Sequence, residues 1–103
     1  MLLTTIPNLG GRKYEVLGMV AGNMVQSKNA FRDIGAGFKS MVGGELRDYT
    51  AMMQEARAEA TNRMVAQAQS MGADAILGVS YATSSIMQGA AEVIAYGTAV
   101  KFK

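Results

Sequence analysis

Residues 48–72 read DYTAMMQEARAEATNRMVAQAQSMG, followed directly by ADAILGVSYA at residues 73–82 and, a little later, by AAEVIAYGTAVKF at residues 90–102. Small and apolar residues recur in the first stretch at spacings of three and four, the period of a helix that packs on other structure. This stripe consists of Met53, Ala56, Ala60, Met64, Ala68 and Met71. The two later stretches are nearly continuous apolar segments joined by a short link. They predict a pair of antiparallel strands.

The ends of these elements carry local signals. Asp48 or Thr50 is a candidate N-cap of the helix, and Gly72 is a natural residue to end it. Turn-forming side chains at Thr83, Ser84 and Ser85, with Gln88 and Gly89 after them, predict the connection between the two strands.

The first 43 residues are less regular. Residues 2–6 (LLTTI) predict a short strand that Pro7 ends, and residues 14–26 predict a long strand with two apolar faces. We expect both faces of that strand to be covered. Residues 29–42 predict a short amphipathic helix, interrupted by glycine, whose apolar stripe is Phe31, Ile34, Phe38 and Met41.

This order of elements predicts a single α+β domain over residues 1–103, in which one long helix covers one face of a mainly antiparallel sheet. The other face also reads as apolar, yet no second long helix is available to cover it. Half of the residues are hydrophobic and only 17% are charged, which is apolar for a chain of 103 residues. We therefore expect copies of the chain to cover one another as a homo-oligomer.

Composition excludes several classes of function. The chain has no cysteine and no histidine, so it has no disulfide framework and no imidazole or thiolate chemistry. Ten lysines and arginines face eight acidic residues and are scattered along the chain, so we expect no nucleic-acid partner. No signal peptide is recognisable, and no apolar run approaches the roughly 20 residues that span a bilayer. A cytoplasmic protein with no membrane partner is the expectation.

A set of residues in the decisive stretch resembles the YbjQ-like family, whose members are small and carry a heavy-metal-binding label. The matching positions are Tyr49, Ala56-Arg57, Ala60, Arg63-Met64, Ala68, Gly72-Ala73-Asp74-Ala75, Leu77-Gly78-Val79 and Gly97-Thr98-Ala99-Val100, with Val16-Leu17-Gly18, Asp33-Ile34 and Gly43-Gly44 upstream. The resemblance implies a dodecin-like β-α-β-β subunit, a ring-shaped homopentamer and no known enzyme activity. Asp74 departs from the family, which more usually has an amide there.

A metal site is difficult to build from this chain. Zinc and copper sites usually use histidine or cysteine. Nine methionines remain as thioether donors, but Met53, Met64 and Met71 fall on the helix stripe, where methionine fills gaps in a core. The carboxylates of Asp33, Glu45, Asp48 and Asp74 are spread along the sequence, although a ring could bring copies together on its axis. The metal ligands and the cofactor therefore stay unknown.

No catalytic residue is predicted. Glu55 and Glu59 lie one helical turn apart, as paired carboxylates for acid–base chemistry do, but a solvated face with Arg57 and Arg63 nearby explains them better.

Asp33, Tyr49 and Arg57 are the candidate ligand-binding residues. They are polar residues at positions where the chain matches the pattern of the family it resembles. The alternative is a structural salt bridge that docks the interrupted helix. The sequence thus leaves three functions: a non-enzymatic homo-oligomeric binding or scaffold protein, preferred here; a heavy-metal-binding protein; and a small-ligand carrier or enzyme with a pocket between subunits.

Overall fold

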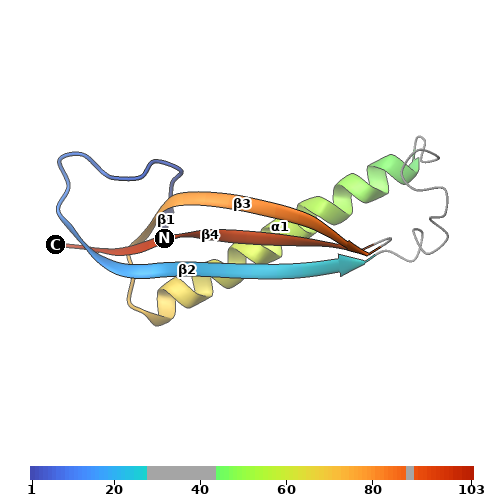
Figure 1. The fold of residues 1–103 in the computed structure, drawn as a ribbon. Coiled ribbons are helices and arrows are strands. Elements are labelled where there is room, and N and C mark those ends of the chain that lie inside the picture. The colour runs from blue at the N-terminus through green and yellow to red at the C-terminus, as the bar shows by residue number, and fades with distance from the viewer. Residues whose placement is uncertain (28–43, 88–89) are drawn as a thin grey trace.

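The computed structural model describes residues 1–27, 44–87 and 90–103, which form four strands and one helix (Figure 1). The elements are β1 (Leu2–Leu3), β2 (Tyr14–Ser27), α1 (Gly44–Ser70), β3 (Ala75–Met87) and β4 (Ala90–Phe102). The helix predicted over residues 29–42, with Phe31, Ile34, Phe38 and Met41, lies outside the described residues, and so does Asp33.

The strands form one mixed sheet in the order β1-β3-β4-β2. β4 is antiparallel to both β2 and β3, which confirms the predicted hairpin, and β1 adds to β3 in parallel. The connection predicted at Thr83, Ser84 and Ser85 is wrong, because these residues continue β3 and pair with Val93, Glu92 and Ala91. Pairing along the whole of β4 outweighs the local turn preference of these side chains.

The helix begins earlier than predicted. It starts at Gly44, so Asp48 and Thr50 lie inside it and do not cap it. The reason is that Glu45, Leu46 and Arg47 are all good helix formers, and nothing among them stops the helix from extending upstream. Within the described ranges, no helix combines the length and apolarity that a bilayer crossing requires.

The end of the helix agrees with the prediction. Gly72 has a φ of 79°, a left-handed conformation that costs glycine little. Its N–H donates to the Gln69 carbonyl at 3.0 Å, and the next N–H, of Ala73, donates to the Ala68 carbonyl at 3.1 Å. These two bonds form a Schellman motif, which turns the chain directly into β3.

The predicted stripe of α1 forms the main core. Ala56, Ala60, Met64 and Ala68 are completely buried against the sheet, and Met53 packs beside them half-buried. Met71 does not belong to the core, because it follows the last helical residue and is 37% exposed. The sheet meets this stripe with small and branched residues, namely Val20 of β2 and Val93, Ala95 and Ala99 of β4.

Helix and sheet are in close contact at Gly22. A Cβ atom added there would collide with the Ala60 carbonyl oxygen and the Met64 nitrogen, and it would lie 2.8 Å from the Arg63 carbonyl carbon. The backbones of β2 and α1 are therefore in direct contact, and only glycine leaves room for that contact.

A bulge interrupts the alternation predicted for β2. The register with β4 shifts between Val16 and Gly18, where Gly18 has a φ of 144°. Leu17 thereby packs on the helix side, and Val16, which strict alternation along the strand would place on the face of Val20, is 61% exposed. The expectation that both faces of this strand are covered is wrong for the single chain, since Met19 and Val25 are also exposed.

A smaller core closes the end of the sheet that carries the chain termini. Ala75, Leu77 and Val100 are buried there under Leu9, Tyr14 and Phe102. The Asp74 carboxylate accepts a hydrogen bond of 2.8 Å from the Phe102 N–H, and the Asp74 N–H donates to the Val100 carbonyl at 2.8 Å. Asp74 therefore ties the start of β3 to the end of β4.

Replacing Gly22 with alanine tests the close contact. Because the added methyl group must push α1 away from the sheet, we expect the variant to lose at least about 2 kcal/mol of unfolding free energy. Gly10→Ala is the matched control, since a Cβ atom added at Gly10 would have nothing within 4 Å, and it should change stability by less than about 0.5 kcal/mol. Urea denaturation of both variants gives the comparison, and equal stability would contradict it.

Candidate functional site

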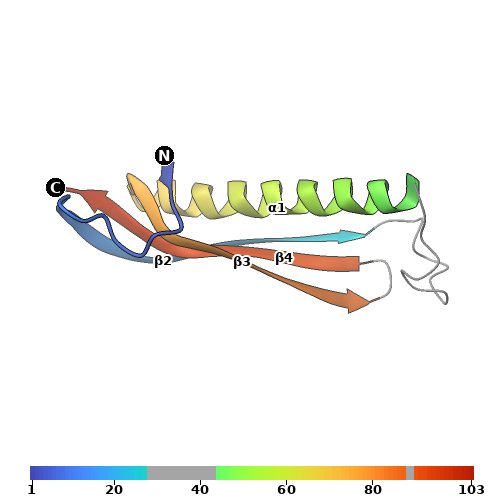
Figure 2. The same ribbon diagram turned by 90° about the horizontal axis from the view of Figure 1, so that it is seen from above.

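One cleft in the described part of the chain lies between the first half of α1 and β3. The helix packs chiefly on β2 and β4, and the far end of β3 swings away from it (Figure 2). The resulting space has a volume of about 360 Å³. The helix contributes Tyr49, Thr50, Met53, Gln54 and Arg57 to its lining, and the sheet contributes Tyr81, Thr83 and Val93.

The floor of this cleft is apolar and one end is polar. Val93 is 2% exposed and Met53 packs against the core beside it. At the polar end the Thr61 hydroxyl donates to the Arg57 carbonyl at 2.7 Å and lies 2.9 Å from the Tyr81 hydroxyl. Since a threonine hydroxyl has a single proton, Tyr81 is the donor in the second bond. This pair of bonds holds the Tyr81 ring against the helix.

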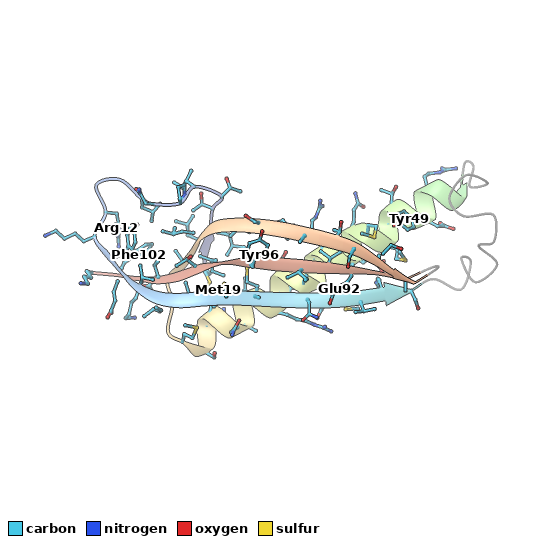
Figure 3. All side chains as sticks on the ribbon, viewed as in Figure 1. Arg12, Met19, Tyr49, Glu92, Tyr96 and Phe102 are labelled. Atoms are coloured by element: carbon cyan, nitrogen blue, oxygen red, sulfur yellow. The ribbon has the colours of Figure 1, made fainter. Side chains whose placement is uncertain are left out.

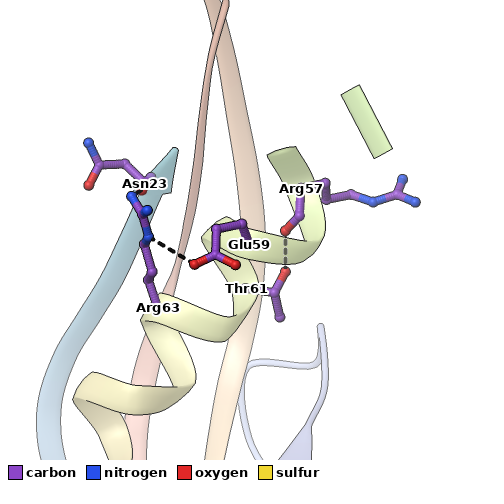
Figure 4. A network of polar contacts seen from close by, with 5 residues as sticks. All are labelled: Asn23, Arg57, Glu59, Thr61 and Arg63. Atoms are coloured by element: carbon purple, nitrogen blue, oxygen red, sulfur yellow. Dashed lines mark hydrogen bonds and ion pairs between the residues drawn. The ribbon is translucent and has the colours of Figure 1, made fainter. Parts of the chain in front are cut away.

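Two of the three predicted ligand-binding residues, Tyr49 and Arg57, line this same cleft. The third, Asp33, lies outside the described residues. The Arg57 side chain extends away from the helix on the flank opposite Arg63 (Figure 4). Its guanidinium makes no ion pair or hydrogen bond with the residues that the structure describes, so it is available to an anion.

The sequence does not single out Tyr81, Thr83 and Val93 as members of a site. Because a turn is predicted at Thr83, the sequence does not indicate that this residue belongs to β3. Once β3 extends through Met87, strand periodicity puts Tyr81 and Thr83 on one face, next to Ala95 and Val93 of β4. The full length of β3 is therefore the information that the sequence would have to supply to identify Tyr81 and Thr83 as site residues.

The opposite flank of α1 is occupied by an ordered polar network. Arg63 Nε lies 3.2 Å from Glu59 Oε1, and Arg63 Nη1 donates to the Asn23 carbonyl at 2.7 Å (Figure 4). One turn later, Gln67 Oε1 accepts a 2.8 Å bond from the Ala21 N–H. Both backbone groups belong to the outer edge of β2, so α1 caps this edge with side chains. Arg57 takes no part in this network.

A second cleft of about 240 Å³ lies on that flank, between α1 and the end of β2. Its lining includes the carboxylates of Asp48 and Glu55, together with Gln26, Ser27, Ala51 and Met52. Glu55 and Glu59 do not form a carboxylate pair, which is the less favoured interpretation of these residues, because Glu59 pairs with Arg63 while Glu55 lines this cleft.

The donor atoms do not fit a heavy-metal site. The sequence contains no cysteine or histidine, and the described residues contain no group of three acidic side chains close enough to hold a metal ion. Three methionines are structural: Met64 is completely buried, Met52 is 6% exposed and Met53 packs in the core. Met19 and Met24 lie on opposite faces of β2, as predicted.

The face of the sheet away from α1 is open along much of β2 and β4 and carries exposed apolar side chains. Met19 is 78% exposed, Val25 is 49% exposed and Tyr96 is 41% exposed. In Figure 3 Met19, Tyr96 and Glu92 follow one another along β2 and β4. Glu92 accepts a 3.1 Å hydrogen bond from the Asn23 amide on this face, so its charge is partly balanced.

Comparison with known proteins places the whole chain in one group. A family model described as "Putative heavy-metal-binding" matches residues 1–103. A UPF0145 protein from Photobacterium profundum is 59% identical over 98% of this chain and 99% of its own length, and one from Clostridium novyi is 54% identical over 98% of each. The crystal structure of a DUF74-family protein of unknown function from Pediococcus pentosaceus, 19% identical, superposes with a TM-score of 0.73 over 100% of this chain and 98% of that one. At that identity the likeness concerns the fold.

The hydroxyl pair at the end of the first cleft provides a prediction. Tyr81→Phe removes the bond to Thr61 and should lower the unfolding free energy by about 0.5–1.5 kcal/mol. Tyr14→Phe removes a hydroxyl that bonds to none of the described residues and should have almost no effect. A double-mutant cycle with Thr61→Val measures the coupling directly, and additive effects of the two substitutions would show that the bond contributes nothing.

Proposed function

This chain belongs to the UPF0145 family, which shares the "Putative heavy-metal-binding" description, and from that premise we propose that it is a non-enzymatic homo-oligomer serving as a binding or scaffold module. The observation that carries the proposal is the open apolar face of the sheet. A ring of five subunits is the assembly implied by the YbjQ-like resemblance.

The residues of the open face form one continuous surface across three strands. Met19 pairs with Thr98; in the next rung, Ala21 lies beside Tyr96 and Tyr96 beside Ser80 of β3. Contiguous exposed apolar surface of this kind is typical of contacts between proteins. We infer that a second copy of the chain covers this face, because most soluble oligomers are built from identical subunits.

The two edges of the sheet are not equivalent, and this favours a closed ring. Arg63 and Gln67 cap the outer edge of β2, whereas β3 from Ser80 onward has no strand on its outer side among the described residues. Contacts between two different surfaces repeat head to tail, and they close into a ring when the rotation between copies divides a full turn. The uncapped edge of β3 could provide one of the two surfaces in such a head-to-tail contact.

A charge on the open face should break the assembly. We expect Met19→Glu to reduce the mass measured by size-exclusion chromatography with light scattering, because a buried unpaired carboxylate is strongly unfavourable. Ala58→Glu places the same charge on the exposed side of α1 and should leave the mass of the wild type unchanged. A wild-type chain that is monomeric at micromolar concentration would refute the proposal.

The family description suggests metal binding as a second function, but the side chains of this chain are poorly suited to bind a metal ion. Hard cations need converging oxygen ligands, and soft cations need thiolate, imidazole or several thioethers. Met53 and Met64 pack in the core, and Met19 and Met24 lie on different faces of β2.

Titration calorimetry of the assembled protein with Zn²⁺, Ni²⁺, Co²⁺ and, under reducing conditions, Cu⁺ tests this conclusion. We expect no binding tighter than about 10 μM, which corresponds to roughly 7 kcal/mol. Stoichiometric binding below that value would establish metal binding as a function of this chain. Its loss on Met19→Leu would locate the site on the open face.

A further inference from the structure

The two clefts beside α1 differ in charge, and this difference points to a ligand. Among the described residues, the lining of the cleft toward β3 carries one formal charge, the guanidinium of Arg57, and no carboxylate. In the part of the chain that the structure describes, the lining of the cleft toward β2 carries the carboxylates of Asp48 and Glu55 and no cation. An anion is therefore favoured on the β3 side and disfavoured on the β2 side.

The shape and surface of the β3-side cleft narrow the choice further. Its volume of about 360 Å³ falls within the range of roughly 300–1,000 Å³ that is usual for small-molecule sites. Val93 and Met53 give it an apolar floor, while Gln54 and Thr83 add polar groups to the lining. Small-molecule sites commonly combine an apolar surface with a few fixed polar groups in this way.

The walls of the cleft are held in place before any ligand arrives. The Thr61 hydroxyl links the Arg57 carbonyl, at 2.7 Å, to the Tyr81 hydroxyl, at 2.9 Å, and so joins helix to strand at one end of the cleft. The Arg57 backbone is fixed by α1, while its guanidinium extends outward (Figure 4). A preformed site of this kind loses less entropy on binding than one that must be assembled.

We propose that this cleft binds a small amphipathic anion, whose apolar body lies on Val93 and Met53 and whose carboxylate or phosphate pairs with Arg57. A planar guanidinium donates two parallel hydrogen bonds to either group. The site is built from one chain and lies on the helix side of the sheet, whereas the open face lies on the other side. The inference therefore goes beyond the proposed assembly and does not depend on it.

Titration calorimetry of the full-length protein with octanoate, octyl phosphate and 1-octanol tests the proposal. We expect one anion per chain to bind, and 1-octanol to bind at least 10-fold more weakly because it leaves Arg57 unpaired. The stronger of the two anions identifies the headgroup as carboxylate or phosphate, and either result supports the proposal. Failure of both anions to bind below about 1 mM would overturn it.

Three variants locate the binding. Arg57→Gln should weaken the anion at least 10-fold and leave 1-octanol unchanged, whereas Arg63→Gln removes the same charge from the opposite flank and should bind as the wild type does. Thr83→Trp fills the cleft and should abolish binding of all three probes while circular dichroism shows a folded chain. Wild-type binding by Arg57→Gln or by folded Thr83→Trp would overturn the proposed site.

A fourth variant separates this inference from the proposed assembly. Met19→Glu should keep the wild-type affinity for the anion even when it no longer assembles, because the cleft is complete within one chain. Loss of binding in that variant would refute the single-chain site and leave the oligomer proposal intact.

Discussion

The contact between the backbone of α1 and Gly22 of β2 sets the positions of the other elements. Three alanines on the helix, Ala56, Ala60 and Ala68, are completely buried, and they allow the helix axis to lie low on the sheet where Gly22 has no side chain. This close contact at Gly22 determines over which strands the helix axis lies. It lies over β2 and β4, and β3 is left beside it.

This off-centre position has opposite effects on the two edges of the sheet. On the β2 side, α1 lies close enough for Arg63 and Gln67 to bond to backbone groups of the strand and cap its edge. On the β3 side, the helix reaches the strand through the hydroxyls of Thr61 and Tyr81, and beyond that point a cleft opens. The same packing contact thus closes one edge and creates a site at the other.

The helix and its stripe, the Gly72 terminator and the antiparallel hairpin could be predicted from the sequence, because each depends on a period or a residue preference inside one segment. The start of α1, the bulge at Gly18 and the full length of β3 could not. In each case pairing or packing with a distant segment decides between local options of similar energy. Residues Thr83 to Ser85 have turn chemistry, yet they form strand because β4 continues beside them.

The candidate site shows the same division. Tyr49 and Arg57 are identifiable through a family pattern, whereas Tyr81, Thr83 and Val93 become site residues only through the sheet. Glu59 and Arg63 stand four residues apart, so helix periodicity already places them on one flank, and the structure contains this ion pair. What the sequence does not reveal is the second contact of Arg63, with the Asn23 carbonyl, because that contact depends on the position of β2.

The methionines illustrate why composition alone is a poor guide to metal chemistry in this fold. A thioether that packs in the core is removed from any metal, and turning Met64 outward would leave a cavity that costs about 2–5 kcal/mol. Met71 reaches back toward Gly18, with its Cε atom 3.5 Å from where a Cβ atom at residue 18 would lie, while Met19 lies on the other face of the sheet. Thioethers that stand on opposite sides of a sheet cannot share an ion within one chain. A single thioether such as that of Met19 is a weak metal ligand. Its apolar, flexible side chain is instead well suited to packing against a second copy of the chain.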